Sequence, residues 1–229
     1  MDAGLLSHIN QARRDRCAIA VITEVQSGAQ QLISDPASVN DPHLRDEIEK
    51  RLKSGKSGVV VQDSVEHFLQ VHVPSPRLVI IGAVHISQAL VPMAQNCEFD
   101  VTVIDPRTAF ATPERFPNVE LIAEWPEEVL QQRPLDRYTA LVTVTHDPKI
   151  DDLPLQTALK QECFYVGALG SRKTHAKRVD RFADAGFSSN DLNPIHAPIG
   201  LNIGAATPAE IAVSIMAQII ESLRKGPGL

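Results

Sequence analysis

Short apolar runs alternate with amphipathic stretches along the chain from residue 77 onward. Residues 78–81 and 101–104 are apolar, largely β-branched runs, which is the pattern of strands buried on both faces of a parallel sheet. Between them, residues 85–95 carry apolar side chains at helical spacing. The three segments together predict a β-α-β unit.

The same alternation continues toward the end of the chain. Further strands are expected at residues 119–123, 140–145 and 164–169, and helices at residues 126–132, 153–160, 171–185 and 208–224. The last helix has the clearest start, because Thr207-Pro208-Ala209-Glu210 has the pattern of a capping box with proline at the first helical position. Alternating strands and helices predict an α/β fold with a Rossmann-like, doubly wound parallel sheet.

Residues 1–73 have a different pattern, in which short strand-like runs follow one another around a single helix. Strands are expected at residues 17–25, 30–33, 59–62 and 67–73, and the helix at residues 43–53. Pro74-Ser75-Pro76 then forms a stiff linker. We therefore expect a small β-rich N-terminal module over residues 1–73 and a Rossmann-like domain over residues 77–229.

Composition narrows the classes of function. The 229 residues carry a formal net charge of −6, which argues against nucleic-acid binding because phosphate backbones are bound by basic faces. No apolar run has the length of a membrane span, and residues 1–10 show no signal-peptide pattern. These features predict a cytoplasmic protein that has no membrane segment.

The three cysteines, Cys17, Cys97 and Cys163, have no metal-ligand spacing. Cysteines that lie beside apolar runs are usually buried and inert. We therefore expect neither a metal site nor a catalytic cysteine.

The loop after the first buried strand has part of a dinucleotide-binding pattern. Gly82 ends the strand, and the acidic residue Asp105 follows 23 positions later at the end of the next strand, where it could reach a ribose hydroxyl. The second glycine of the usual G-x-G-x-x-G pattern is replaced by Val84, whose branched side chain would lie where a pyrophosphate approaches. The pattern predicts the fold, and it leaves NAD(P) open as a ligand.

Ligands of open parallel sheets bind outside the carboxyl ends of the strands, so residues at the expected strand ends are the candidate site. They are rich in histidine, acid and arginine: Gly82, Asp105, Arg107, His146, Asp147, Gly170, Ser171 and Arg172. His85 follows the first strand and points toward the same crevice. His196 and Gly200 lie in a glycine-bearing loop before the last helix, where a glycine allows close approach of a ligand or a strand.

Gly170-Ser171-Arg172-Lys173 is the best candidate for an anion site. A glycine turn opens a helix whose free N–H groups attract negative charge, Ser171 can cap that helix, and the guanidinium of Arg172 suits phosphate. A solvated basic first turn is the alternative. His146-Asp147, with Asp151 and Asp152 nearby, could likewise form an acid/base pair or bind a metal, or it could simply be a turn before Pro148.

Taken together, these segments resemble the XdhC/CoxI family, the accessory proteins of xanthine dehydrogenase and related molybdenum hydroxylases. The resemblance covers about residues 67–224. It rests on Pro76-Arg-Leu-Val-Ile-Ile-Gly82, Val103-Ile-Asp-Pro-Arg107, Thr145-His-Asp147, Tyr165-Val-Gly-Ala-Leu-Gly-Ser-Arg172, and Ala197-Pro-Ile-Gly-Leu-Asn-Ile-Gly204 followed by Thr207-Pro-x-Glu-Ile211.

The resemblance implies a Rossmann-type domain that binds molybdenum cofactor, protects it while its sulfido ligand is installed, and delivers it to an apoenzyme. The strand-end residues, with His85, His196, Gly200 and Asn202, are then the expected cofactor-binding residues. The implied partners are a molybdenum hydroxylase apoenzyme, a cysteine desulfurase and a small CoxI-type protein, and a homodimer is left open. Such a protein is a cofactor-binding chaperone rather than a catalyst.

Three positions depart from the family pattern. Val84 replaces a glycine of the Gly-x-Gly-His loop, Asn202 replaces an aspartate, and residues 1–66 contain no Gly-Gly-Cys motif. A separate partner that carries the missing motif would explain the absence of Gly-Gly-Cys. The absence would also be explained if this chain were a paralogue that has lost part of the family's activity. The alternative function is an NAD(P)-dependent oxidoreductase or a nucleotide-binding protein on the same scaffold.

Overall fold

The computed structural model describes residues 3–62 and 64–225. The chain divides into two units, Met1–Pro74 and Ser75–Leu229. The first unit contains a four-stranded antiparallel sheet in the order β2-β1-β4-β3. Its elements are α1 (Ala3–Arg14), β1 (Ile19–Glu24), β2 (Gln30–Ile33), a 3₁₀ turn (Pro36–Ser38), α2 (Pro42–Ser54), β3 (Gly58–Gln62) and β4 (Val65–His72).

In the first unit, β1 pairs with β2 and β3 pairs with β4 as antiparallel hairpins, and α2 covers one face of the sheet. Ile48 of α2 packs on Ala20 and Leu69, all three fully buried. Helix α1 was not expected from the sequence. It buries Ile9 against Ile19 and Val21 on the other face, so the module is β-rich but carries a helix on each side.

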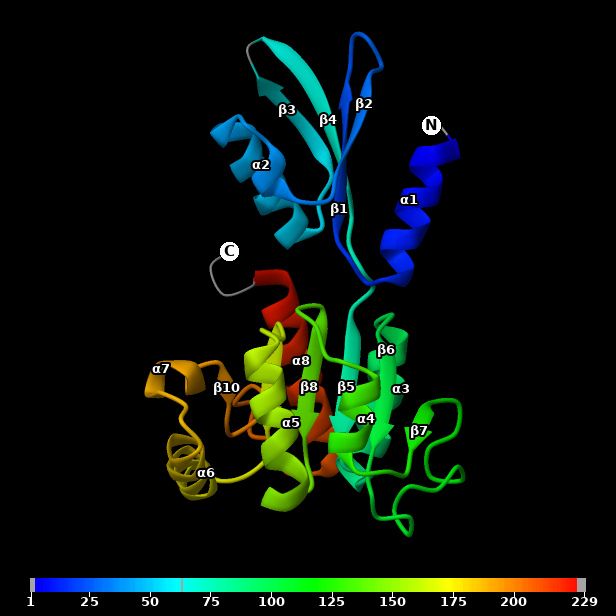
Figure 1. Ribbon diagram of the computed structural model, residues 1–229. Coiled ribbons are helices and arrows are strands. Elements are labelled where there is room, and N and C mark those ends of the chain that lie inside the picture. Colours follow the sequence, from blue (N-terminus) through cyan, green and yellow to red (C-terminus); the bar gives the residue numbers. More distant parts are fainter. Residues whose placement is uncertain (1–2, 63, 226–229) are drawn as a thin grey trace. The chain divides into compact units, whose positions relative to one another are not determined.

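The second unit is an α/β domain with a six-stranded parallel sheet (Figure 1). Its spatial order, β10-β9-β8-β5-β6-β7, is that of a doubly wound sheet. The elements are β5 (Arg77–Ile81), α3 (His85–Asn96), β6 (Asp100–Ile104), β7 (Glu120–Ile122), α4 (Pro126–Gln132), β8 (Thr139–Thr143), α5 (Pro148–Lys160), β9 (Tyr165–Ala168), α6 (Arg172–Asp184), α7 (Ser189–Leu192), β10 (Ile195–His196) and α8 (Pro208–Lys225).

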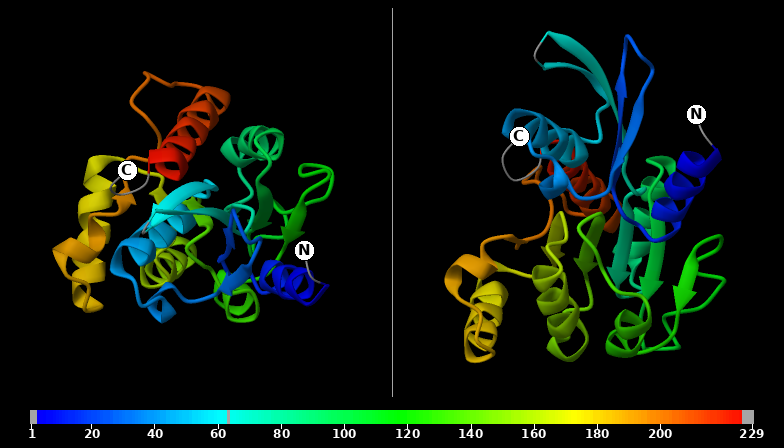
Figure 2. Two further views of the ribbon diagram at one scale, coloured as in Figure 1. Left: turned by 90° about the horizontal axis from the view of Figure 1, so that it is seen from above. Right: turned by 45° about the horizontal axis from the view of Figure 1, so that its top comes forward.

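The first two strands pair in parallel, as the β-α-β pattern predicts, with Leu78 opposite Val101 on one side and Ala140 on the other. Alternate residues of β5 face opposite sides of the sheet. Leu78 and Ile80 pack with α3 and α8, whereas Val79 and Ile81 pack with α4, α5 and α6. Helices therefore cover both faces (Figure 2), and the sequence-based prediction of the fold class is confirmed.

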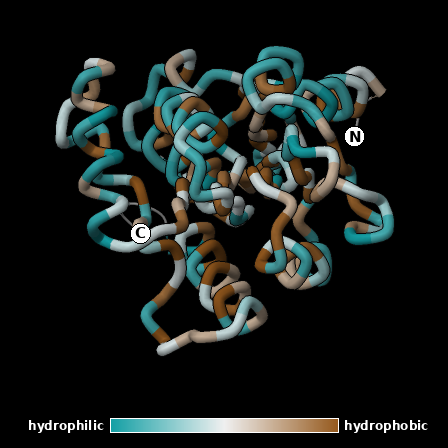
Figure 3. The backbone as a smooth tube through the Cα atoms, turned by 90° about the horizontal axis from the view of Figure 1, so that it is seen from below, coloured by the Kyte–Doolittle hydropathy of each residue, from teal (hydrophilic) through white to brown (hydrophobic). Residues whose placement is uncertain are grey.

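The helix starts show how local sequence positions these elements. Thr207 and Glu210 form the expected capping box at the start of α8: the Glu210 N–H donates to Thr207 Oγ1 (3.3 Å) and the Thr207 N–H donates to Glu210 Oε2 (2.9 Å). Helix α5 begins five residues before the expected position, because Asp147 caps it by accepting from the Lys149 N–H (3.0 Å). Hydrophobic and hydrophilic residues are interspersed along the helical turns of the chain, as Figure 3 shows.

The three cysteines were expected to be buried and inert, since they lie beside apolar strands or after a helix. Cys17 and Cys97 are exposed and Cys163 is half-buried, so the expectation of three buried thiols was wrong. Cys97 follows the last turn of α3, where the chain reaches the surface. Within residues 3–62 and 64–225, none of the helices has both the length and the apolar character that crossing a bilayer requires.

Candidate functional site

The order of the parallel strands defines a switch point between β5 and β8. The chain leaves β5 toward β6 and β7 on one side, and then returns to build β8, β9 and β10 on the other. Crossover connections diverge at such a point, and the crevice at the carboxyl ends of the two strands is the usual ligand site. The four strand-end loops chosen from the sequence all lie along this carboxyl edge.

Gly82 lies at the switch point, and its backbone requires a glycine. Its φ is +118°, and a Cβ atom there would lie 2.8 Å from Cγ2 of Thr145 and 3.2 Å from Cγ2 of Val144. The β5–α3 turn thus packs directly against the β8–α5 turn. Buried Ser87, in the first turn of α3, donates to the Gly82 carbonyl (2.5 Å) and fixes the turn from the other side.

Asp105 is fully buried at the end of β6, and both of its oxygens are occupied. It accepts from the Ala83 N–H (2.7 Å), and from the backbone N–H (2.9 Å), Nε (2.9 Å) and Nη2 (2.7 Å) of Arg107. Burial alone raises the pKa of Asp105, but the hydrogen bonds from Arg107 and Ala83 bring it below its ordinary value. The guanidinium of Arg107 also lies over the Phe110 ring, 4.6 Å from its centroid.

The loop after β8 carries a second buried carboxyl group, that of Asp151, on the first turn of α5. Thr145 Oγ1 donates to Asp151 Oδ1 (2.7 Å) and accepts from the Asp147 N–H (3.0 Å). Burial raises the pKa of Asp151 to about 6, against the opposing effects of the Thr145 hydrogen bond and the charge of Arg178. His146 is exposed in this turn and has a φ of +64°.

The turn after β9 opens α6 as the sequence predicts. Gly170 has a φ of +134°, and Ser171 caps the helix by accepting from the Thr174 N–H (3.2 Å). Arg172 is exposed. Arg178, nearly two turns further along, is 3% exposed and donates from Nη2 to the Leu169 carbonyl (3.3 Å), while its Nε and Nη1 atoms have no hydrogen-bond partner.

A pocket of about 240 Å³ opens between the first turn of α5 and the first three turns of α6. Asp151 and Arg178, which are 1% and 3% exposed, form its floor. The remaining lining residues are His146, Pro148, Asp152, Ser171, Lys173, Thr174, Lys177 and Arg181. The pocket lies at the carboxyl edge of the sheet, beyond the ends of β8 and β9 and beside the switch point rather than in it. Its lining brings together two of the residues that were chosen from the sequence, His146 and Ser171.

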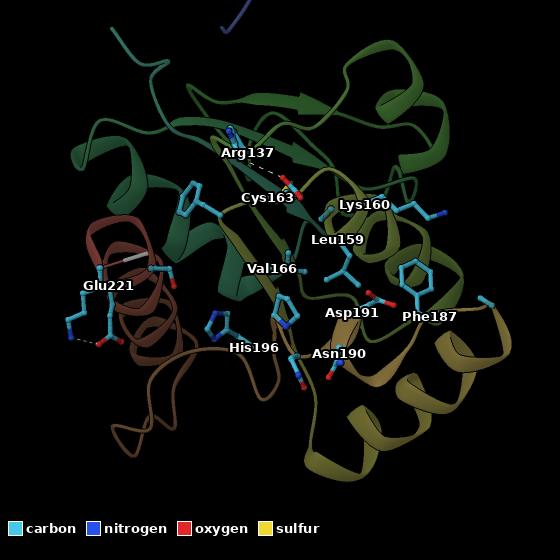
Figure 4. Close-up of a pocket in the computed structure, with 18 of the residues that line it drawn as sticks. Arg137, Leu159, Lys160, Cys163, Val166, Phe187, Asn190, Asp191, His196 and Glu221 are labelled. Atoms are coloured by element: carbon cyan, nitrogen blue, oxygen red, sulfur yellow. Dashed lines mark hydrogen bonds and ion pairs between the residues drawn. The ribbon is translucent and has the colours of Figure 1, made fainter. Parts of the chain in front are cut away.

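A larger pocket of about 1210 Å³ lies at the opposite, amino-terminal edge of the sheet (Figure 4). Its lining includes Lys160 at the end of α5, Cys163 before β9, and Glu221 in the last turns of α8. His196 lines this pocket, and its ring stacks on that of Tyr165 with centroids 4.8 Å apart. Size alone would favour this pocket, but ligands of open parallel sheets usually bind at the carboxyl edge, so the smaller pocket is the candidate site.

Other candidates from the sequence lie apart from the smaller pocket. Gly200 lies against α8: its N–H donates to Gln218 Oε1 (2.8 Å), and a Cβ atom would be 2.3 Å from Ser214 Oγ. The close approach inferred for this glycine is therefore to a helix of the same domain. Asn202 and His85 are exposed, and neither is among the residues that line the two pockets.

Arg178 was missed in the sequence, and Asp151 was noted only as a neighbour of the His146-Asp147 pair. The signal was present, because Arg178 follows Thr174 by four residues and precedes Phe182 by four, on the inward face of α6. A charged residue in an inward-facing stripe is rarely buried without a role. In the part of the chain that the structure describes, no group of three or more His, Cys, Asp or Glu side chains could hold a metal ion.

Three curated proteins are similar to this chain. They are an uncharacterized protein, YqeB, of Escherichia coli K12 (32% identity, 70% of this chain and 30% of that protein), a probable xanthine dehydrogenase subunit of Bacillus subtilis 168 (33%, 69% and 46%), and the molybdenum cofactor insertion chaperone PaoD of E. coli K12 (27%, 64% and 40%). The chain therefore spans less than half the length of each of these relatives.

A solved structure shares the fold. The crystal structure of a xanthine dehydrogenase from Bacillus halodurans matches 97% of this chain and 65% of its own chain, with a TM-score of 0.67 and 24% identity. The family model of the XdhC Rossmann domain matches residues 78–219, which include every strand of the parallel sheet except the first residue of β5. This chain belongs to the XdhC family through that domain.

Proposed function

We propose that this chain is an accessory protein of a molybdenum hydroxylase of the xanthine dehydrogenase type. In this proposal it binds molybdenum cofactor as cargo and assists the sulfuration of the cofactor or its insertion into the apoenzyme. Membership of the XdhC family supports the proposal, as do the names of two relatives, a molybdenum cofactor insertion chaperone and a probable xanthine dehydrogenase subunit.

The observation that carries the proposal is the charge of the pocket at the carboxyl edge. The cargo is anionic, since it has a phosphate group and a metal bound through a dithiolene. Four basic side chains line the pocket against two acidic ones, and Arg181 is already paired with Asp152 (2.6 and 2.9 Å). The pocket is thus locally positive in a chain whose net charge is −6, and the first turn of α6 adds its free N–H groups.

In this proposal, the pocket residues bind the cofactor, orient it and exclude water from it. Lys173 and Lys177 are exposed at the rim, where they attract the anion, and the buried floor holds the end that enters. Arg107 lies close enough to Asp147 and Asp151 for their charges to raise its pKa, after the larger effect of its hydrogen bond with Asp105. Its guanidinium is a candidate contact for a second anionic group.

The neighbouring strand-end residues complete the proposed site. Gly82 and Gly170 shape the two turns, and Asp147 and Ser171 cap the helices that flank the pocket. The further partners that this function requires are a cysteine desulfurase, and a small CoxI-type protein for the motif that residues 1–66 lack.

Charge reversal at the rim tests the proposal. The double variant Lys173→Glu/Lys177→Glu should lower activation of a cofactor-free molybdenum hydroxylase about tenfold or more, since each exposed charge contact contributes up to about 1 kcal/mol and the two introduced carboxylates also repel the anion. The variant should fold, because both side chains are exposed. Arg224→Glu, an exposed cation in the last turn of α8, is the matched control and should leave activation unchanged. Equal activation by the parent and the double variant would reject this site.

A further inference from the structure

The floor of the pocket contains two opposite charges that do not satisfy each other. Asp151 Oδ2 has no hydrogen-bond partner, and neither have Nε and Nη1 of Arg178. The two groups interact electrostatically, yet the described residues show no ion pair between them within 4.0 Å. The nearest carboxylate to Arg178 is that of Asp152, at 4.0 Å from Nε.

The neighbouring pair on the same two helices shows that the helix spacing permits full pairing. Asp152 accepts from Nε (2.6 Å) and Nη2 (2.9 Å) of Arg181, in a two-pronged ion pair between α5 and α6. One residue earlier on α5 and three residues earlier on α6, Asp151 and Arg178 are more deeply buried and stay apart. Buried polar groups left without partners are costly, so a pair of them in one pocket indicates a group that binds between them.

The hydrogen-bonding capacity of the two side chains defines that group. An ionised carboxylate only accepts, and a guanidinium only donates. A ligand that satisfies both must present a donor beside an acceptor. A phosphate dianion offers acceptors alone and would meet the negative charge of Asp151. A planar heterocycle with an N–H beside a carbonyl, such as a 2-amino-4-oxopyrimidine ring, offers both in one edge.

We propose that Asp151 and Arg178 bind the 2-amino-4-oxopyrimidine edge of a pterin ring, with Asp151 accepting from the ring N–H and the exocyclic amine and Arg178 donating to the ring carbonyl. This inference rests on the proposed function, whose cargo carries such a ring. The pocket volume of about 240 Å³ lies below that of pockets that enclose whole ligands, about 300–1,000 Å³. It therefore accommodates one end of the cofactor and leaves the anionic end to the cationic rim.

Titration of the full chain with free heterocycles tests the recognition of this edge. Pterin should bind, and lumazine, in which an oxo group replaces the 2-amino group, should bind about tenfold to a hundredfold more weakly, because it turns a carbonyl toward Asp151. Inorganic phosphate should not displace pterin. Equal affinity for pterin and lumazine, or displacement by phosphate, would overturn the proposal. Tighter binding of guanosine than of pterin would reassign the pocket to a guanine nucleotide and overturn it as well.

The floor substitution Asp151→Asn has a matched control at Asp152, the next residue on the same helix. Asp151→Asn should weaken pterin binding by about tenfold or more, whereas Asp152→Asn should change it far less, since Asp152 is occupied by Arg181. Arg178→Gln alone removes the counter-charge of Asp151 and endangers folding, so the double variant Asp151→Asn/Arg178→Gln is measured beside it. Binding of pterin by Asp151→Asn as tightly as by the parent would show that the pair is only structural.

The cofactor content of the same proteins separates this inference from the proposed function. If the anaerobically purified parent carries molybdenum cofactor and Asp151→Asn carries as much, the function stands and the assignment of this edge fails. If the parent carries none, the proposed function fails. If the parent does not bind pterin, the inference fails whatever the cofactor content.

Discussion

Asp151 shows how a single residue can oppose stability at the site. The residue is 1% exposed, and burial raises the pKa of its carboxyl group from an ordinary value of 3.8 to about 6. Because the folded-state pKa is the higher one, the protonated group favours folding. That contribution is fully present below pH 3.8 and is lost as the pH rises through about 6. At neutral pH the protein holds a charge that costs stability, as expected of a group kept for binding.

Asp151→Asn should therefore stabilise the α/β unit at pH 7.5, by up to roughly 3 kcal/mol for a shift of about two pKa units. The gain should shrink as the pH falls toward 4, where the parent carboxyl group is protonated. Urea unfolding of the parent and the variant at pH 5, 6 and 7.5 measures this difference. A constant difference across these pH values would contradict the pKa that burial gives to Asp151.

Arg172 and Arg178 show which information a local sequence pattern lacks, because the pattern indicates one arginine and the tertiary structure buries the other. The sequence indicates Arg172, because it follows a glycine turn at a strand end. The structure places Arg172 in solvent and Arg178 on the pocket floor. Which of two arginines on one helix faces inward depends on how α6 packs on the sheet, and the first turn alone does not encode it.

Arg172→Ala should still lower retention of the cofactor, but by no more than about fivefold, because exposed charge contacts contribute up to about 1 kcal/mol. Arg172→Lys should recover only part of the loss, since an ammonium group cannot make the two-pronged contact of a guanidinium. Cofactor retained after anaerobic gel filtration is the measurement. A loss with Arg172→Ala larger than with Asp151→Asn would move the site from the pocket floor to the helix start.

At the scale of elements, local sequence patterns predict the strands and long helices well. Apolar runs indicate β5, β6 and β8, and α4 has the expected bounds. Helix α7 and the two-residue strand β10 were not predicted. Strand β10 exists through its pairing with β9, Ile195 opposite Val166, and such a short strand has no periodicity of its own. His196 was consequently placed in a loop near the crevice, and it lies on the other pocket.

The β5–α3 turn is the segment that should determine the affinity for dinucleotides. The N-cap of α3 is Val84, which makes no side-chain capping bond, and Asp105 is held by Arg107. NADH should therefore bind weakly, Val84→Gly should improve its affinity, and Arg107→Ala added to that variant should improve it further by freeing Asp105. Fluorescence titration with NADH tests the series. Tight binding by the parent would favour the oxidoreductase alternative.

At the scale of the whole molecule, each unit has a hydrophobic core of its own. The α/β unit buries apolar residues on both faces of its sheet, and the first unit buries its own set around Ile48 and Leu69. We propose that the linker at Pro74-Ser75-Pro76 separates two domains that fold independently, since a domain boundary falls where few contacts cross.

A fragment of residues 75–229 should accordingly unfold in one cooperative transition, with a Tm within a few degrees of the corresponding transition of the full chain. Differential scanning calorimetry of the fragment and the full chain makes the comparison. A fragment without a cooperative transition would show that residues 1–74 complete its core.

The claim that the chain carries molybdenum cofactor is tested most directly by its contents when it is purified. The full chain is purified anaerobically from cells that make the cofactor, and native mass spectrometry is combined with detection of the oxidised pterin by its fluorescence. The account predicts a bound species with the mass of the cofactor and a pterin signal, both reduced in Lys173→Glu/Lys177→Glu and unchanged in Arg224→Glu. A protein free of pterin, or one that carries a nicotinamide dinucleotide instead, would contradict it.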